Sequence, residues 1–148
     1  MKVKLLAFTK VKDKGLKQLI AEYERRLTHH NVRFETLTFP ESKQDKQQDR
    51  LKIYKEQHQH ETIVLLDEFS TTMTTKEFSS FLKKRWIDGG VVTFILGDAH
   101  GFEETFKKGF DHRISLSPMT FPHEIAWLVW IEQVYRCVCI QSNITDHK

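Results

Sequence analysis

The sequence predicts an α/β protein with a mostly parallel sheet, and three observations lead to this class. Short apolar runs of strand length alternate with longer segments of helical spacing. Two of the runs, TIVLLD (62–67) and VVTFIL (91–96), are apolar almost throughout, as in parallel strands that are covered on both faces. The length of 148 residues, with 39% hydrophobic and 29% charged residues, suits a single globular domain over residues 1–148.

The first part of the chain contains two expected strands on either side of an amphipathic helix. The run VKLLAF (3–8) is short and apolar, and VRFETLTF (32–39) carries apolar groups at alternating positions. The helix between them has Asp13 as its expected N-cap. Its apolar residues recur at i, i+3, i+4, i+7 and i+11. They are Leu16, Leu19, Ile20, Tyr23 and Leu27.

The next segment, residues 40–61, is polar throughout and has little to bury. Leu51, Ile53 and Tyr54 are the side chains that we expect to be buried there. A helix that packs on a sheet needs an apolar stripe, and three residues make a narrow one. We therefore expect either a weakly held helix or a mobile crossover, rather than a domain boundary.

The expected elements after residue 67 follow one another with short connections. A helix over 75–86 is stopped by Gly89 and Gly90. The loop GDAHG (97–101) comes directly after the buried strand at 91–96. The remaining elements are a short helix at 103–110, a strand at 112–117 and a long helix at 120–141.

The long final helix is expected to begin with Thr120 as its N-cap and Pro122 in its first turn. It is apolar on nearly every side, and it carries Trp127 and Trp130 within four positions. One sheet face does not need that much apolar surface. The helix therefore predicts a subunit interface.

Charge narrows the class of partner. The formal net charge of +3 permits a nucleic-acid partner without demonstrating one. Clusters of basic residues are usually solvated, but near a ligand-binding edge they would suit the phosphates of an RNA. The clusters are Lys10, Lys12, Lys14 and Lys17, then Arg25 and Arg26, then Lys83, Lys84 and Arg85.

Other partners are not expected. Cys137 and Cys139 lie in an apolar run, which indicates small core residues in a cytoplasmic protein. The first residues, MKVKLLAF, are too short an apolar run for a signal peptide. No run approaches the roughly 20 apolar residues of a membrane span. The eight histidines and two cysteines show no metal-ligand spacing, so we expect neither membrane nor metal.

The fold class nominates a place for a ligand. In open parallel sheets, ligands bind outside the carboxyl ends of the strands, here after Leu66, Leu96 and Leu116. The loop GDAHG lacks both the Walker motif and the dinucleotide fingerprint. Gly97 would let a flat ligand approach the backbone, but the loop also suits a plain strand-to-helix turn.

The segment SLSPMTFPH (115–123) has two interpretations. Its prolines and hydroxyl residues suit a well-made helix start. They also fix backbone N–H and C=O groups in an arrangement that could read the edge of a purine. We interpret His123 as structural rather than catalytic.

Four stretches together resemble a known family. They are KVKLLAFTKVKDKGLKQLIAEYERRL near the start, VLLDEFS and FILGDAHG in the middle, and SLSPMTFPHEIAWLVWIEQVYR near the end. The chain resembles the RlmH (YbeA-like) branch of the SPOUT methyltransferases over its whole length. That resemblance implies a C-terminal trefoil knot, a homodimer, and methylation of N3 of a pseudouridine in large-subunit (23S) rRNA of the assembled ribosome.

The resemblance also implies site residues. S-adenosylmethionine would contact positions that match Leu66, Gly97, Leu116, Ser117, Pro118, Met119, Thr120 and Phe121. The family's Tyr-His-Lys/Arg ending matches His147 and Lys148, which would serve the substrate as catalytic residues.

Three positions depart from the family pattern. Asp98 stands where a second glycine is usual, Trp127 replaces an arginine and Asp146 replaces the tyrosine of the ending. The alternative function is therefore a non-catalytic or divergent knotted protein that binds RNA or the ribosome.

Overall fold

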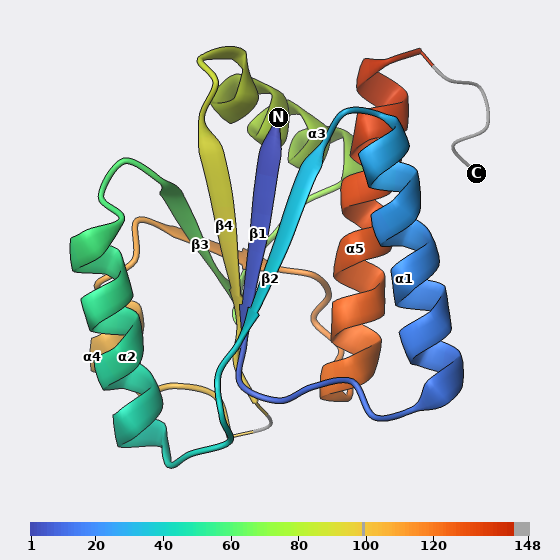
Figure 1. Ribbon diagram of the computed structural model, residues 1–148. Helices are drawn as coiled ribbons and strands as arrows, with labels where there is room; N and C mark the ends of the chain where they lie inside the picture. The colour runs from blue at the N-terminus through green and yellow to red at the C-terminus, as the bar shows by residue number, and fades with distance from the viewer. Residues whose placement is uncertain (99, 144–148) are drawn as a thin grey trace.

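The computed structural model describes residues 1–98 and 100–143 and contains one sheet of five strands, all parallel, which confirms the predicted class. The strand order is β2-β1-β4-β3-β5. Figure 1 shows the strands side by side between helices. The strands are β1 (Lys2–Ala7), β2 (Arg33–Thr38), β3 (Thr62–Thr72), β4 (Val91–Leu96) and β5 (His112–Ser115).

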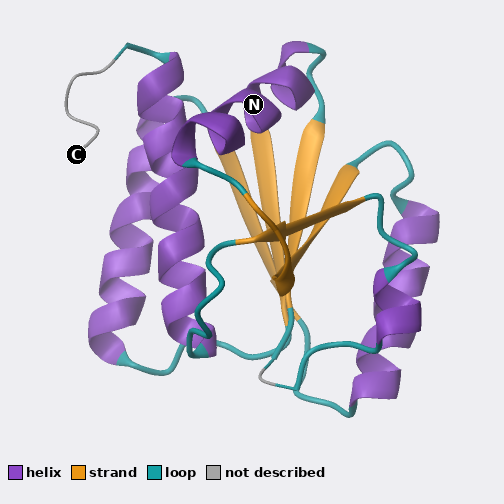
Figure 2. Ribbon diagram, turned by 180° about the vertical axis from the view of Figure 1, so that it is seen from behind, coloured by secondary structure: helices purple, strands orange, loops and turns teal. Residues whose placement is uncertain are grey.

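Helices cover both faces of the sheet, as Figures 1 and 2 show from opposite sides. One face carries α1 (Lys14–His29), α3 (Thr75–Ile87) and α5 (His123–Gln141), and the other carries α2 (Gln44–Gln57) and α4 (Glu104–Lys107). Successive side chains of β1 point to opposite faces of the sheet. Val3, Leu5 and Ala7 belong to the larger core, whereas Leu6 belongs to the smaller one. This two-sided burial explains why β4 and the first half of β3 are apolar almost throughout.

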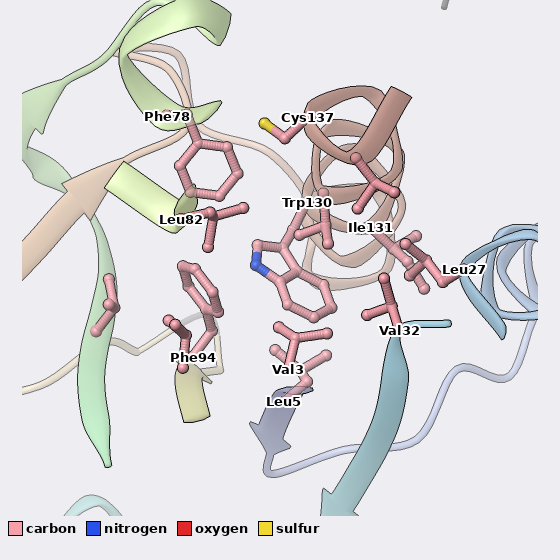
Figure 3. Close-up of a cluster of buried hydrophobic side chains, with 14 of the residues drawn as sticks. Val3, Leu5, Leu27, Val32, Phe78, Leu82, Phe94, Trp130, Ile131 and Cys137 are labelled. Atoms are coloured by element: carbon pink, nitrogen blue, oxygen red, sulfur yellow. The ribbon is translucent and has the colours of Figure 1, made fainter. Parts of the chain in front are cut away.

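The tryptophans of α5 correct the predicted subunit interface. Trp130 is 0% exposed and Trp127 is 5% exposed within a single chain. The ring of Trp130 lies between Phe34 and Phe94, at the centre of the larger core (Figure 3). Helix α5 is apolar on most sides because it packs on α1, α3 and the sheet at once, so these two residues give no argument for a second subunit.

The start of α5 also differs from the prediction. The helix begins at His123, its N-cap is Pro122, and no side chain caps it. Thr120 does not cap the helix, because its hydroxyl donates to Glu68 Oε2 at 2.6 Å, across 52 residues of sequence. The hydroxyl residue of this segment therefore holds a loop in place instead of starting a helix. By contrast, the predicted cap of α1 is confirmed: Asp13 Oδ1 accepts from Leu16 N at 2.9 Å.

The polar segment after β2 forms a helix of 14 residues, α2. Leu51 and Tyr54 are buried as expected, but Ile53 is 54% exposed. Two glutamines, Gln47 and Gln48, are buried instead. The prediction is therefore wrong for Ile53 alone, and α2 is held partly by polar contacts, which are described below.

The cysteines are free and buried, as predicted. Burial raises the pKa of the Cys137 thiol to about 12, so it stays protonated and unreactive at neutral pH. Among the described helices, none is long and apolar enough to cross a membrane.

Candidate functional site

A cavity of about 270 Å³ opens at the carboxyl end of the sheet, between residues 65–69 of β3 and the segments that follow β4 and β5. Its volume is close to the lower end of the range for small-molecule sites, roughly 300 Å³. Seven of the residues predicted to contact a cofactor lie in its wall: Leu66, Gly97, Leu116, Ser117, Met119, Thr120 and Phe121. Pro118 is exposed and is not part of the wall. His147 and Lys148 fall outside the described residues.

Gly97, directly after β4, is a glycine for a steric reason. A Cβ atom at this position would lie 2.9 Å from Cε2 of the Phe102 ring and 3.2 Å from its Cζ. Phe102 is buried against Phe8 and Phe106, so its ring has little room to move. The backbone at Gly97 can therefore border the cavity only without a side chain.

The end of β5 and the loop after it are hydrogen-bonded to Glu68, within β3. The hydroxyl of Ser115 lies 3.0 Å from the Glu68 carbonyl oxygen and 2.9 Å from that of Ser117. Met119 N donates to Ser117 Oγ at 3.0 Å, and Thr120 donates to the Glu68 carboxylate. These bonds fix the backbone of residues 115–120, as the interpretation of a rigid, ligand-reading loop requires.

His123 lies where three segments meet. Its Nδ1 is 3.2 Å from the Gly97 carbonyl oxygen, and its Nε2 is 3.2 Å from the Thr9 carbonyl oxygen. A neutral imidazole donates from only one nitrogen at a time. In addition, the Glu124 carboxylate accepts from the backbone N–H groups of Lys12 and Asp13. The first turn of α5 thus joins the β1–α1 loop to the cavity wall, which supports a structural role for His123.

Lys107 is a buried cation in the cavity wall that the sequence did not reveal. Its Nζ lies 3.2 Å from Asp67 Oδ1 and 3.1 Å from Glu104 Oε1. Burial alone would disfavour the ammonium, but the hydrogen bonds to Glu104 and Asp67 outweigh it and raise the pKa of Lys107. Asp67 could have been anticipated, since it directly follows Leu66. Lys107 could not have been anticipated, because nothing in the sequence distinguishes it from its neighbour Lys108.

The rim of the cavity is apolar and open. Phe69 is 80% exposed and Met119 is 75% exposed, and both border the cavity. The wall also contains the carboxylates of Asp67, Glu68 and Asp98. In the part of the chain that the structure describes, no three His, Cys, Asp or Glu side chains are grouped to hold a metal ion.

A parallel sheet with a small-molecule cavity at its carboxyl edge defines a class of α/β proteins that bind nucleotides and related cofactors. Comparison with known proteins narrows this class. The family model described as "Predicted SPOUT methyltransferase" matches residues 1–147. The chain belongs to the SPOUT methyltransferase family.

Full-length relatives agree with the family model. The chain is 31% identical to the ribosomal RNA large subunit methyltransferase H of Ruminiclostridium cellulolyticum, with 100% of both chains covered. It is 35% identical to the protein of the same name from Porphyromonas gingivalis, with 99% of both chains covered. Among solved structures, it is similar to the SpoU methyltransferase AviRb of Streptomyces viridochromogenes, at 9% identity and a TM-score of 0.48, covering 95% of this chain and 60% of that one.

Proposed function

We propose that this protein transfers a methyl group from S-adenosylmethionine to N3 of a pseudouridine in 23S rRNA of the assembled ribosome. One observation carries the proposal: a single cavity brings together residues 65–69 of β3 and the segments after β4 and β5, which resemble the cofactor-binding segments of the family. The full-length relatives named ribosomal RNA large subunit methyltransferase H support the substrate class.

The residues of the cavity fit this cofactor. Gly97 borders the cavity with its backbone alone, because the Phe102 ring occupies the space that a side chain would fill. The fixed loop at 115–120 offers further backbone groups to the edge of a bound ring. Three carboxylates and one ammonium line the wall, an excess of negative charge that suits a sulfonium cation. Leu66, Gly97, Leu116, Ser117, Met119, Thr120 and Phe121 are therefore proposed as the binding residues, whereas Pro118 lies outside the wall. When bound, the cofactor supplies an electrophilic methyl group.

The reaction depends mainly on the alignment of the reacting atoms. A bond forms between the methyl carbon and N3 as the sulfur–methyl bond breaks, and the N3 proton leaves to a base or to water. The chain's task is to orient the reacting atoms and exclude water, which is a positioning task. We assign contact with the substrate to His147 and Lys148, on the match to the family's ending. Either a base or a hydrogen-bond acceptor would suffice for the proton.

We also propose the assembly that the family implies: one SPOUT methyltransferase domain with a trefoil knot, acting as a cytoplasmic homodimer. The exposed Phe69 and Met119 at the cavity rim support the dimer, because a second subunit would cover both. The knot is proposed on the resemblance to the family, and the bonds from Ser115 and Thr120 to Glu68 hold the chain after β5 against β3.

The rRNA would meet the surface beside the cavity. Four exposed lysines lie on the loop after β1 and the first turn of α1: Lys10, Lys12, Lys14 and Lys17. They are at the carboxyl end of the strands, as the cavity is (Figure 1). Among the described residues, none of these four lysines has a carboxylate within ion-pair distance. The cluster at Lys83 and Lys84 lies at the end of α3, toward the amino end of the strands. The first cluster is therefore the better candidate for phosphate contacts.

Replacing Lys10 and Lys14 by glutamine is expected to raise the KM for ribosomes about three- to tenfold. The slope of log affinity against log salt concentration should fall by about 1.5, because two phosphate contacts are lost. Affinity for S-adenosylmethionine should not change. The matched control is Lys83→Gln with Lys84→Gln, which removes the same charge from the amino end of the strands. Equal effects of the two pairs would mean that only net charge matters.

The function itself is tested with labelled S-adenosylmethionine and ribosomes that carry the unmethylated pseudouridine. We expect transfer to 23S rRNA, with ribosomes a better substrate than protein-free rRNA. Cofactor binding without any transfer would favour the alternative of a non-catalytic ribosome-binding protein. Absence of cofactor binding in calorimetry would contradict the proposal.

A further inference from the structure

Three glutamines at the start of α2 contact the segment that follows β4. Gln44 Nε2 donates to the Gly101 carbonyl oxygen at 3.0 Å. Gln47 Nε2 donates to Asp98 Oδ2 at 2.8 Å. The third bond runs the other way, because Gln48 Oε1 accepts from Glu103 N at 3.0 Å. Positions i, i+3 and i+4 share one face of a helix, so this glutamine clamp (Gln44, Gln47, Gln48) is a single surface.

The burial of Gln47 indicates that the contact determines where α2 lies. Glutamine is rarely buried completely, yet Gln47 is fully buried. Its Nε2 also donates to the Ser42 carbonyl oxygen at 3.0 Å, while its buried Oε1 has no partner in the described part of the chain. A leucine of similar size would avoid that unsatisfied oxygen. Unlike an apolar residue, Gln47 donates a hydrogen bond to Asp98, and this bond accounts for a polar side chain at a buried position.

Asp98 links the clamp to the cavity. It borders the cavity beside Gly97, and both of its carboxylate oxygens are engaged. One accepts from Gln47, and the other accepts from His100 N at 2.9 Å. The side chain that departs from the family's glycine is thus held by α2 and by its own loop.

We infer that the glutamine clamp positions the wall of the cofactor cavity, with the Gln47–Asp98 bond at its centre. This inference rests on the proposed function in one respect, the identity of the cofactor. Gln47 is not a wall residue, so it acts as a positioning residue through Asp98. Helix α2, polar and expected to be weakly held, becomes the element on which cofactor affinity depends.

The test is a double-mutant cycle of Gln47→Leu and Asp98→Ala, read by calorimetry with S-adenosylmethionine. Gln47→Leu is expected to weaken cofactor binding about tenfold, because the Asp98 carboxylate loses its partner. Asp98→Ala should have a similar effect, and the double variant should be no weaker than either single variant. The KM for the cofactor should rise while kcat stays within about twofold. Gln57→Leu, on the exposed end of the same helix, is the matched control and should bind as the wild type does.

Two further measurements separate positioning from mere stability. The midpoint of thermal unfolding should change little in Gln47→Leu, because removal of the unsatisfied Oε1 offsets the loss of the two hydrogen bonds from Nε2. Amide hydrogen exchange at Gly101 and Glu103 should become faster in the same variant without any cofactor. Unchanged affinity and exchange together with lowered stability would overturn the inference. If the wild type binds no S-adenosylmethionine, the proposed function fails, but the exchange measurement still decides whether the clamp holds the wall.

Discussion

Gly97→Val is expected to lower the affinity for S-adenosylmethionine by at least about a hundredfold. The added Cβ would lie 2.9 Å from the Phe102 ring, and two further methyl groups would crowd the same space. Because Phe102 packs on Phe8 and Phe106, the ring cannot yield without disturbing the smaller core. The backbone at Gly97 must therefore move, either into the cavity or away from its place in the wall. Calorimetric titration with the cofactor measures the loss.

A second substitution tests whether the clash with Phe102 is the cause. Phe102→Leu removes the ring atoms that the new side chain would meet, so it should recover part of the affinity lost in Gly97→Val. Gly15→Ala, in the first turn of α1 and outside the cavity wall, is the control and should leave binding unchanged. Wild-type affinity in Gly97→Val would mean that this part of the cavity does not bind the cofactor.

Lys4→Met is expected to reduce the free energy of unfolding by about 3 to 5 kcal/mol. Lys4 Nζ lies 2.6 Å from Glu61 Oε2, in a buried pair on the α2 side of the sheet. The other oxygen of Glu61 accepts from Tyr54 at 2.6 Å and from Thr93 at 2.7 Å. Without Lys4, the buried Glu61 carboxylate would keep only the hydroxyls of Tyr54 and Thr93 as hydrogen-bond donors. Urea unfolding measures the change.

The acid dependence of stability gives this prediction a direction. Burial by itself opposes ionisation of Glu61, but its bonds from Lys4, Tyr54 and Thr93 outweigh burial and lower the pKa of the carboxyl. Its contribution to stability is therefore present above the ordinary glutamate pKa of about 4.3, and is lost as the pH falls through the lower folded-state pKa. In Lys4→Met, acidification lets Glu61 take up a proton, so the deficit relative to the wild type should shrink.

The same strand offers a matched control. Lys2 pairs with Glu35 at 3.4 Å, but the two side chains are 35% and 43% exposed, far more than those of Lys4 and Glu61. Lys2→Met should therefore change stability by no more than about 1 kcal/mol. If Lys4→Met and Lys2→Met cost the same, the buried network does not contribute as described.

Much of the fold followed from local pattern. The strand at 91–96 was placed at its observed bounds, because a run of six residues, five of them apolar, that ends at glycine has few other solutions. Asp13 was recognised as a cap from its place before an amphipathic repeat, a signal that lies within a few residues. The rule that ligands bind at the carboxyl ends of parallel strands also predicted the segments that border the cavity, since parallel strands bring these ends to one side of the sheet.

The rest depends on partners that are distant in sequence. Thr120 looks like a helix cap until Glu68, 52 residues away, is found beside it. Gln47 looks solvent-exposed because the residue that makes its burial tolerable, Asp98, lies 51 residues further on. Trp130 looked like an interface residue because sequence does not reveal that α5 packs between two helices of its own chain. Local sequence rules predict helices, strands and the end of the sheet at which a ligand binds, whereas these residue pairs depend on tertiary contacts.

The most direct test of the proposed function is nucleoside analysis of 23S rRNA by mass spectrometry. The rRNA is taken from ribosomes that lack the methyl group, after incubation with this protein and S-adenosylmethionine. We predict that N3-methylpseudouridine appears and that it is absent when the cofactor is left out. Unmodified 23S rRNA, or a methyl group on a different nucleoside, would contradict the proposed reaction.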